Sequence, residues 1–177
     1  LIEQHHGLDL IHDVALLEEV SGLVEWPVAL LGEVDTAFSD LPAEVLQASM
    51  KEHQKFFSLK NSKTGKIERF ITVANIEAAD NGETILKGNQ KVLYARLSDA
   101  KFFWENDIRL IQKDGLDAWL GKLVNVTFHN KLGSQADKVA RVSALTKILA
   151  KRLLCDIEDA VKSANICKSD LASEMVY

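Results

Sequence analysis

The sequence predicts an α+β protein in which a mixed α/β N-terminal half is followed by an all-helical C-terminal half. Two observations support this fold class. Runs rich in Val, Ile and Phe, separated by turn signals, end by Asn75, whereas apolar residues recur at helical spacing from Asn89 onward. We therefore expect two domains, an α+β module over residues 1–87 and a helical module over residues 88–177.

Apolar periodicity and turn signals assign the elements of the first half. They predict, in order, a helix over 8–20, a strand over 24–34, a helix from about 41 to 53, strands over 56–60 and 67–75 joined by a hairpin loop over 61–66, and a polar loop over 76–87. Pro27 makes the first strand an edge strand, because proline cannot donate a ladder hydrogen bond. Asp40 is expected to cap the second helix, and Asp80-Asn81-Gly82 marks the polar loop.

The second half has a helical pattern over 89–113, 115–124, 135–154 and 156–177. In the first of these helices, Leu93 and Leu97 lie on an apolar face, and Arg96 and Asp99 lie three residues apart along its edge. We expect Arg96 and Asp99 to form a partly buried structural ion pair. The last helix keeps its apolar spacing without a stop signal, and residue 1 is not methionine, so we expect an internal segment of a longer protein.

Charge is distributed unevenly along the chain. Residues 1–50 contain ten Asp and Glu and no Lys or Arg, so the remaining 16 acidic and 21 basic residues give residues 51–177 a net charge of +5. No apolar run approaches the ~20 residues of a membrane-spanning helix. Two isolated cysteines, Cys155 and Cys167, are typical of reduced core thiols in the cytoplasm. We expect no membrane or DNA partner.

No motif in the sequence indicates a catalytic centre. Gly65-Lys66 and Gly121-Lys122 lack the preceding glycine of a phosphate-binding loop. The His12-Asp13 pair has only His5 and His6 upstream, too close to supply ligands from a separate helix, and we interpret these histidines as surface residues.

The clearest candidate for a binding site is a basic segment near residue 140. Its cations are Lys131, Lys138, Arg141, Lys147, Lys151 and Arg152, against one acidic residue, Asp137. Such cations could contact phosphates, while Leu145, Ile148, Leu149 and Leu153 would give the same helix its core face. The alternative is a solvated amphipathic helix. A second RNA hypothesis is base stacking at His53-Gln54-Lys55-Phe56-Phe57, against which stands a core role for the phenylalanines.

Seven segments, taken together and in order, carry a family resemblance: 23–32, 41–46, 50–57, 70–75, 88–107, 128–138 and 168–176. This ordered set resembles the beta subunit of the bacterial two-subunit (alpha2-beta2) glycyl-tRNA synthetase. The resemblance implies a non-catalytic part of a cytoplasmic glycine–tRNA ligase, an aminoacyl-tRNA synthetase of protein biosynthesis. Its partners would be the alpha subunit and tRNA(Gly), and the basic segment would contact tRNA. It also implies that ATP and magnesium bind the alpha subunit, so that this segment needs no cofactor or metal.

The same resemblance implies that the helical half is a degenerate version of the HD-type metal-dependent phosphohydrolase domain. His129 stands where a first metal ligand would be, but Lys168-Ser169-Asp170 stands where a His-Asp pair would be required. A lysine charge disfavours a cation there. An HD-type phosphohydrolase, an editing hydrolase and a pure scaffold remain the alternatives to tRNA binding.

Overall fold

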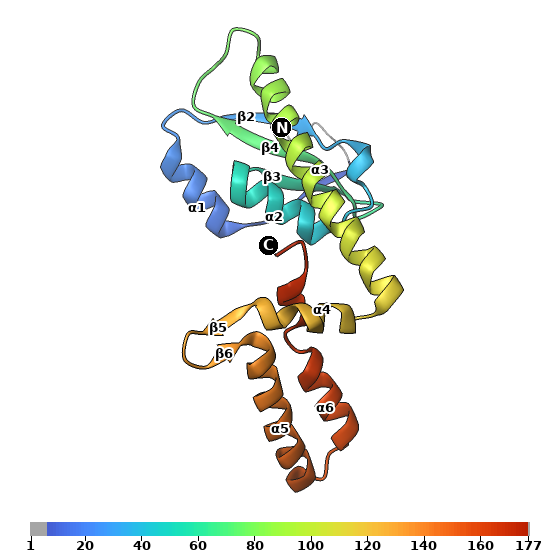
Figure 1. Cartoon of the computed structure of the whole chain (residues 1–177). Coiled ribbons are helices and arrows are strands. Elements are labelled where there is room, and N and C mark those ends of the chain that lie inside the picture. Colours follow the sequence, from blue (N-terminus) through green and yellow to red (C-terminus); the bar gives the residue numbers. More distant parts are fainter. Residues whose placement is uncertain (1–6, 177) are drawn as a thin grey trace. The chain divides into compact units, whose positions relative to one another are not determined.

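The computed structural model describes residues 7–176, which form an α+β structure of helices and a small antiparallel sheet (Figure 1). The chain divides into two compact units between Lys101 and Phe102. The longest helix, α3 (Glu83–Asp114), runs through this division, so the predicted domain boundary at 87/88 lies inside a helix. Among the described residues, no helix is long and apolar enough to cross a bilayer.

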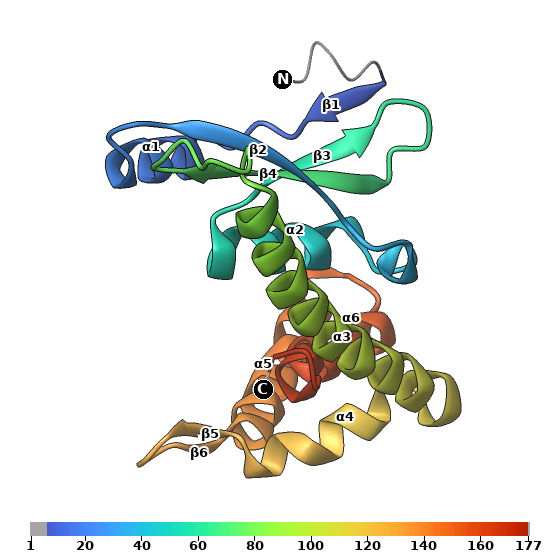
Figure 2. The same cartoon turned by 90° about the horizontal axis from the view of Figure 1, so that it is seen from above.

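The first unit is built on a four-stranded antiparallel sheet with the strand order β1-β3-β4-β2 (Figure 2). The strands are β1 (Leu8–Leu10), β2 (Val28–Glu33), β3 (Phe57–Asn61) and β4 (Ile67–Ala74). β2 begins directly after Pro27 and lies at the edge of the sheet, which confirms the edge-strand prediction. The predicted hairpin is also confirmed, since β3 pairs with β4 around the loop 62–66.

Both faces of this sheet carry apolar side chains. On one face, Leu16 and Val20 of α1 (Val14–Leu23) pack with Leu59 and neighbouring strand residues. Phe70 of β4 is fully buried and stacks on Phe56 with ring centroids 4.4 Å apart. The sheet and its helices thus have a well-packed core of their own.

Three local features of the first unit differ from prediction. Residues 8–10 form β1 rather than a helical turn, because the helix begins only after Asp13, whose carboxylate accepts a hydrogen bond from the Leu16 backbone at 2.9 Å. Pro42, not Asp40, is the residue before α2 (Ala43–Gln54). α3 begins six residues earlier than predicted, at Glu83, because Asp80 accepts hydrogen bonds from Gly82 and Thr84.

The second unit consists of the end of α3, three further helices and a hairpin. Its elements are α4 (Asp117–Lys122), the 3₁₀ turn η3 (Leu123–Asn125), β5 (Thr127–His129), β6 (Gly133–Ser134), α5 (Gln135–Leu153), α6 (Ile157–Ile166) and the 3₁₀ turn η4 (Ser169–Ala172). Trp119, Leu123, Val139 and Ala172 form its buried centre. The all-helical prediction was therefore wrong at β5 and β6.

The last predicted helix is also shorter than expected, since α6 ends at Ile166. The following residues are held by Asp107, a buried α3 residue that is 4% exposed. Its carboxylate accepts hydrogen bonds from the Ser173 hydroxyl at 2.6 Å and from the Glu174 and Met175 backbones at 3.0 and 3.3 Å. These bonds satisfy backbone groups of residues 174 and 175 that a helix continued to residue 177 would have paired internally.

Candidate functional site

The basic segment is organised by the junction between the β5–β6 hairpin and α5. Ser134 caps α5, and Asp137 completes a reciprocal capping box by accepting from the Ser134 backbone at 2.8 Å. These hydrogen bonds, with Arg141 nearby, hold the pKa of the Asp137 carboxyl below its usual value. Asp137, the one acidic residue of the segment, is therefore engaged in the hydrogen bonds that cap α5 where the hairpin ends.

An aromatic ring adjoins the cations at this junction. The Lys138 ammonium lies 4.2 Å from the centroid of the Phe128 ring, a cation–π contact that holds the half-buried lysine against β5. Lys131 is exposed at the hairpin tip, where its backbone donates to the His129 Nδ1 at 3.1 Å. The sequence analysis missed Phe128, because residues ten apart are brought together only by the hairpin; the Ser134-x-x-Asp137 pattern, in contrast, was a readable capping signal.

The remaining predicted cations, Arg141, Lys147, Lys151 and Arg152, are all exposed on α5 but do not share one face. At about 100° per residue, Val139 and Ala150 mark the buried arc of the helix. Lys147 and Lys151 lie beyond one edge of that arc, beside exposed Ala144. Arg141 and Arg152 lie roughly 100° further round the helix. The structure thus separates the predicted binding residues into two groups.

The predicted core face of α5 is not buried in the described residues. The exposed fractions are 57% for Leu145, 55% for Ile148, 46% for Leu149 and 71% for Leu153. Val139 belongs instead to the core of the second unit, with Ala136 packed against that core, and Ala150 is also buried. The predicted core face of α5 was therefore wrong for this unit, which buries a different arc of the helix.

Arg96 and Asp99 do not form the predicted partly buried pair. Both residues are exposed on α3, and no ion pair joins them among the ion pairs of residues 7–176. Only the apolar part of the prediction holds, because Leu93 and Leu97 are 2% and 0% exposed. Because both side chains are solvated, a contact between Arg96 and Asp99 would contribute little to the stability of the fold.

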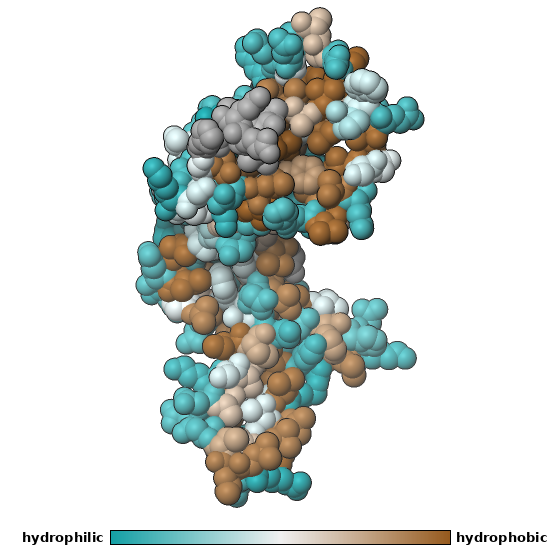
Figure 3. Space-filling view, turned by 180° about the vertical axis from the view of Figure 1, so that it is seen from behind, coloured by the Kyte–Doolittle hydropathy of each residue, from teal (hydrophilic) through white to brown (hydrophobic). Residues whose placement is uncertain are grey.

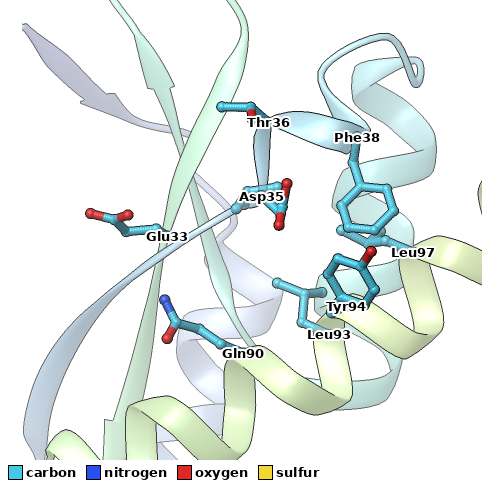
Figure 4. Close-up of a pocket in the computed structure, with 9 residues that line it drawn as sticks. Glu33, Asp35, Thr36, Phe38, Gln90, Leu93, Tyr94 and Leu97 are labelled. Atoms are coloured by element: carbon cyan, nitrogen blue, oxygen red, sulfur yellow. The ribbon is translucent and has the colours of Figure 1, made fainter.

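A hollow of about 440 Å³ in the first unit was not anticipated from the sequence (Figure 4). Glu33, the last residue of β2, and Asp35 and Thr36, which follow the strand, line one side. Gln90 and other α3 residues line the other. Tyr94 packs edge-on against Phe38 with ring centroids 5.1 Å apart. The lining contains carboxylates, an amide and hydroxyl groups but no Cys, His, Lys or Arg. It could accept a small polar ligand, but it lacks a nucleophile paired with a base.

The other sequence candidates are dispersed or buried. His12 is exposed, and His5 and His6 lie outside the described residues. Within residues 7–176, no three His, Cys, Asp or Glu side chains gather in a way that could hold a metal ion. Phe56 and Phe57 are 3% and 9% exposed, which rules out the proposed base stacking and favours the core alternative. Cys155 and Cys167 are free thiols but are exposed, not in the core as predicted.

Comparison with known proteins identifies the class. The whole chain, residues 1–177, matches the sequence model of the glycyl-tRNA synthetase beta subunit. It is 61% identical over 172 residues to the glycine–tRNA ligase beta subunit of Ruegeria sp. (strain TM1040), 58% identical to that of Dinoroseobacter shibae and 49% identical to that of Phenylobacterium zucineum. These matches cover 96–97% of the chain.

These matches place the chain in the class of aminoacyl-tRNA synthetase subunits, which confirms the resemblance seen in the sequence. It belongs to the glycyl-tRNA synthetase beta subunit family. The chain spans about a quarter of the length of the curated relatives it matches, 25% for the Ruegeria protein and 24% for the Dinoroseobacter protein.

Proposed function

We propose that this chain is a non-catalytic segment of a glycine–tRNA ligase beta subunit, which supports ATP-dependent glycylation of tRNA(Gly) in the cytoplasm. The alpha subunit and tRNA(Gly) are its partners. Family membership over the whole chain supports the role in glycyl-tRNA synthesis. The exposed cations of α5 and the hairpin support a contribution to tRNA binding, and exposed apolar surface supports a contribution to assembly.

The main support for a tRNA contact is the arrangement of Lys147 and Lys151. They are four residues apart, one helical turn, on an exposed polar arc. Their ammonium groups are free of acidic partners among the ion pairs of the described residues. Cations in this arrangement can follow a phosphate backbone and release its counterions. Lys131 is a further exposed cation, at the hairpin tip that precedes the N-terminal end of α5.

Within residues 7–176, the two glycine–lysine pairs give no support to a nucleotide site in this segment. Gly65-Lys66 lies in the turn between β3 and β4, and Gly121-Lys122 lies at the end of α4, so neither pair opens onto a helix N-terminus as a phosphate loop does. The alpha subunit then supplies the nucleotide site and the chemistry. This chain's own residues contribute binding and positioning.

A hydrolase is the less favoured alternative. In an HD-type enzyme or a metal-dependent editing enzyme, several ligands must converge, but His129 uses its Nδ1 to accept from Lys131 and Asp170 lies on the exposed side of η4. A degenerate HD-like helical unit remains our interpretation of the second half. A pure scaffold is the closer rival, because it would use the same fold without engaging the cations.

The experiment compares tRNA binding by the complete alpha–beta enzyme with and without the two lysines. Lys147→Ala with Lys151→Ala should weaken tRNA(Gly) binding at low salt. Because each lost phosphate contact removes about 0.7–0.9 from the slope of log affinity against log salt, the slope should fall by about 1.5. Glycine-dependent ATP–pyrophosphate exchange should not change, because this reaction does not involve tRNA.

A matched control removes the same charge elsewhere. Lys60→Ala with Lys63→Ala changes two exposed lysines of the first unit and should leave the salt slope intact. If the α5 double variant and this control behave alike, Lys147 and Lys151 do not contact tRNA. The same result after substitution of Lys138 and Arg141 would make the scaffold role the better account.

A further inference from the structure

Large apolar side chains cover one side of α5 and continue around the turn into α6. We call this surface the α5 apolar face; its residues are Val142, Leu145, Ile148, Leu149, Leu153, Leu154 and Ile157. Their exposed fractions run from 38% for Val142 to 93% for Leu154. Hydrophobic surface gathers over this end of the second unit at the bottom of Figure 3. A continuous exposed face of this kind marks an interaction site.

The face has the pattern of a buried helix contact. Val142, Leu145, Leu149 and Leu153 follow one another at intervals of three, four and four residues, so they form a single stripe. The stripe is about 17 Å long, since eleven residues rise by 1.5 Å each. A stripe of this length and spacing matches the apolar side of a second helix packed along α5.

Leu154 shows that the face continues past the end of the helix. It adopts the left-handed conformation, with φ +57, at the C-terminal end of α5. Glycine takes this position at least cost, and a leucine that is 93% exposed gains nothing from the described fold. A large apolar residue in a glycine position is explained if its side chain is buried by something outside residues 7–176.

We propose that the α5 apolar face is covered by an amphipathic helix from the rest of the full-length beta-subunit polypeptide. Because the chain spans about a quarter of its relatives' length, about three times as much polypeptide remains to supply that helix. Arg141 and Arg152 emerge within the face, so the covering helix carries acidic residues beside its apolar stripe.

Charge argues against a second copy of α5 as the occupant. A two-fold contact between two α5 helices would bring Arg141 and Arg152 of both copies together, with Asp137 as the helix's one acidic residue and already bonded to Ser134. The leucines equally do not suit a nucleic acid, whose backbone demands cations. Coverage of this face would leave Lys147 and Lys151 on the uncovered arc.

The test measures solvent access to two positions of α5 in the full-length beta subunit, without the alpha subunit. In a background with native cysteines replaced by serine, Leu149→Cys places a thiol in the face, and Ala144→Cys places one on the exposed polar arc. The rate of modification by Ellman's reagent is compared with the rate for the same variant unfolded. Leu149→Cys should react at least about tenfold more slowly when folded, and Ala144→Cys should react at nearly the unfolded rate.

Leu154→Cys provides a second variant if Leu149→Cys does not fold, because its side chain makes little contact within the described residues. Unprotected thiols at both face positions would overturn the proposal. Protection that appears only after the alpha subunit is added would also overturn the proposal, because it would assign the face to that partner. Protection that appears only at raised protein concentration would overturn it as well, because it would assign the face to self-association. Equal protection at Ala144→Cys would also overturn it, because the face would then not be distinguished from the rest of the helix.

Discussion

Replacing Asp107 by alanine tests how the C-terminal segment of the second unit is held. The Asp107 carboxylate is 4% exposed and accepts three hydrogen bonds, one from the Ser173 hydroxyl and two from the Glu174 and Met175 backbones. Removing it leaves the 7%-exposed Ser173 hydroxyl without this acceptor and frees the Glu174 backbone donor in partly buried surroundings. The Met175 amide loses its 3.3 Å bond to Asp107 but still donates to the Ser173 hydroxyl oxygen at 3.0 Å. The segment would then have to open to solvent.

The magnitude follows from these bonds. Hydrogen bonds to a charged group contribute about 1.5–3 kcal/mol each, but the three bonds share one carboxylate and the segment can partly hydrate when it opens. We therefore expect Asp107→Ala to lower the free energy of unfolding by about 3 kcal/mol. Asp107→Asn keeps one acceptor oxygen and should cost about half as much.

Denaturant unfolding of the 177-residue chain measures the loss, and hydrogen exchange locates it. The Glu174 and Met175 amides should exchange faster in Asp107→Ala, while those of the β3–β4 hairpin should not. Asp99→Ala is the matched control, since it removes an exposed carboxylate from the same helix and should change stability by less than about 0.5 kcal/mol. If Asp107→Ala costs no more than this control, the carboxylate does not hold the segment.

Two further predictions concern the first unit. A methyl group at Gly32 would overlap the tip of the Phe70 ring, which Phe56 holds by stacking, so Gly32→Ala should destabilise the chain by about 1–3 kcal/mol in denaturant unfolding; an unchanged midpoint would show that the ring can move. A hydrogen bond from Lys51 and one from the α1 backbone lower the pKa of Asp13 from 3.8, so its stabilising contribution is complete above that value and is lost as the pH falls through the lowered pKa. Asp13→Asn should accordingly flatten the acid side of a plot of melting temperature against pH, and a parallel curve would contradict this.

Local signals were sufficient to predict much of the first unit. Pro27 correctly indicated an edge strand, and the polar loop between residues 61 and 66 correctly joined two strands. The start of the first helix was predicted too early. Residues 8–10, including Asp9, form β1, and α1 begins only after Asp13, which accepts the Leu16 amide. This later start depends on β1 pairing with β3, which is a long-range contact.

The candidate site was only partly predictable for a related reason. The cations of the basic segment are exposed or half-buried, as expected, but a helix sequence fixes their angular positions and not the direction in which the helix is packed. The Phe128–Lys138 contact and the Asp107 hydrogen bonds join residues that are ten or more positions apart. No local pattern in the sequence identifies such pairs. The Arg96–Asp99 prediction failed because spacing of three residues permits contact without burying either side chain.

The way α5 is packed explains why its predicted core face is exposed and determines which of its cations are available for the proposed tRNA contact. Periodicity predicted that Leu145, Leu149 and Leu153 would be buried, but they are exposed and this unit buries another arc of the helix. If a helix of the full-length subunit covers the leucines, both arcs are packed, and Lys147 and Lys151 are the cations that stay in solvent. The tRNA-binding role would then fall on these lysines and on Lys131, while Arg141 and Arg152 would serve the protein contact. Substituting the two pairs separately should give different results, because loss of the lysines would change the salt dependence of tRNA binding and loss of the arginines would chiefly change the stability of the subunit.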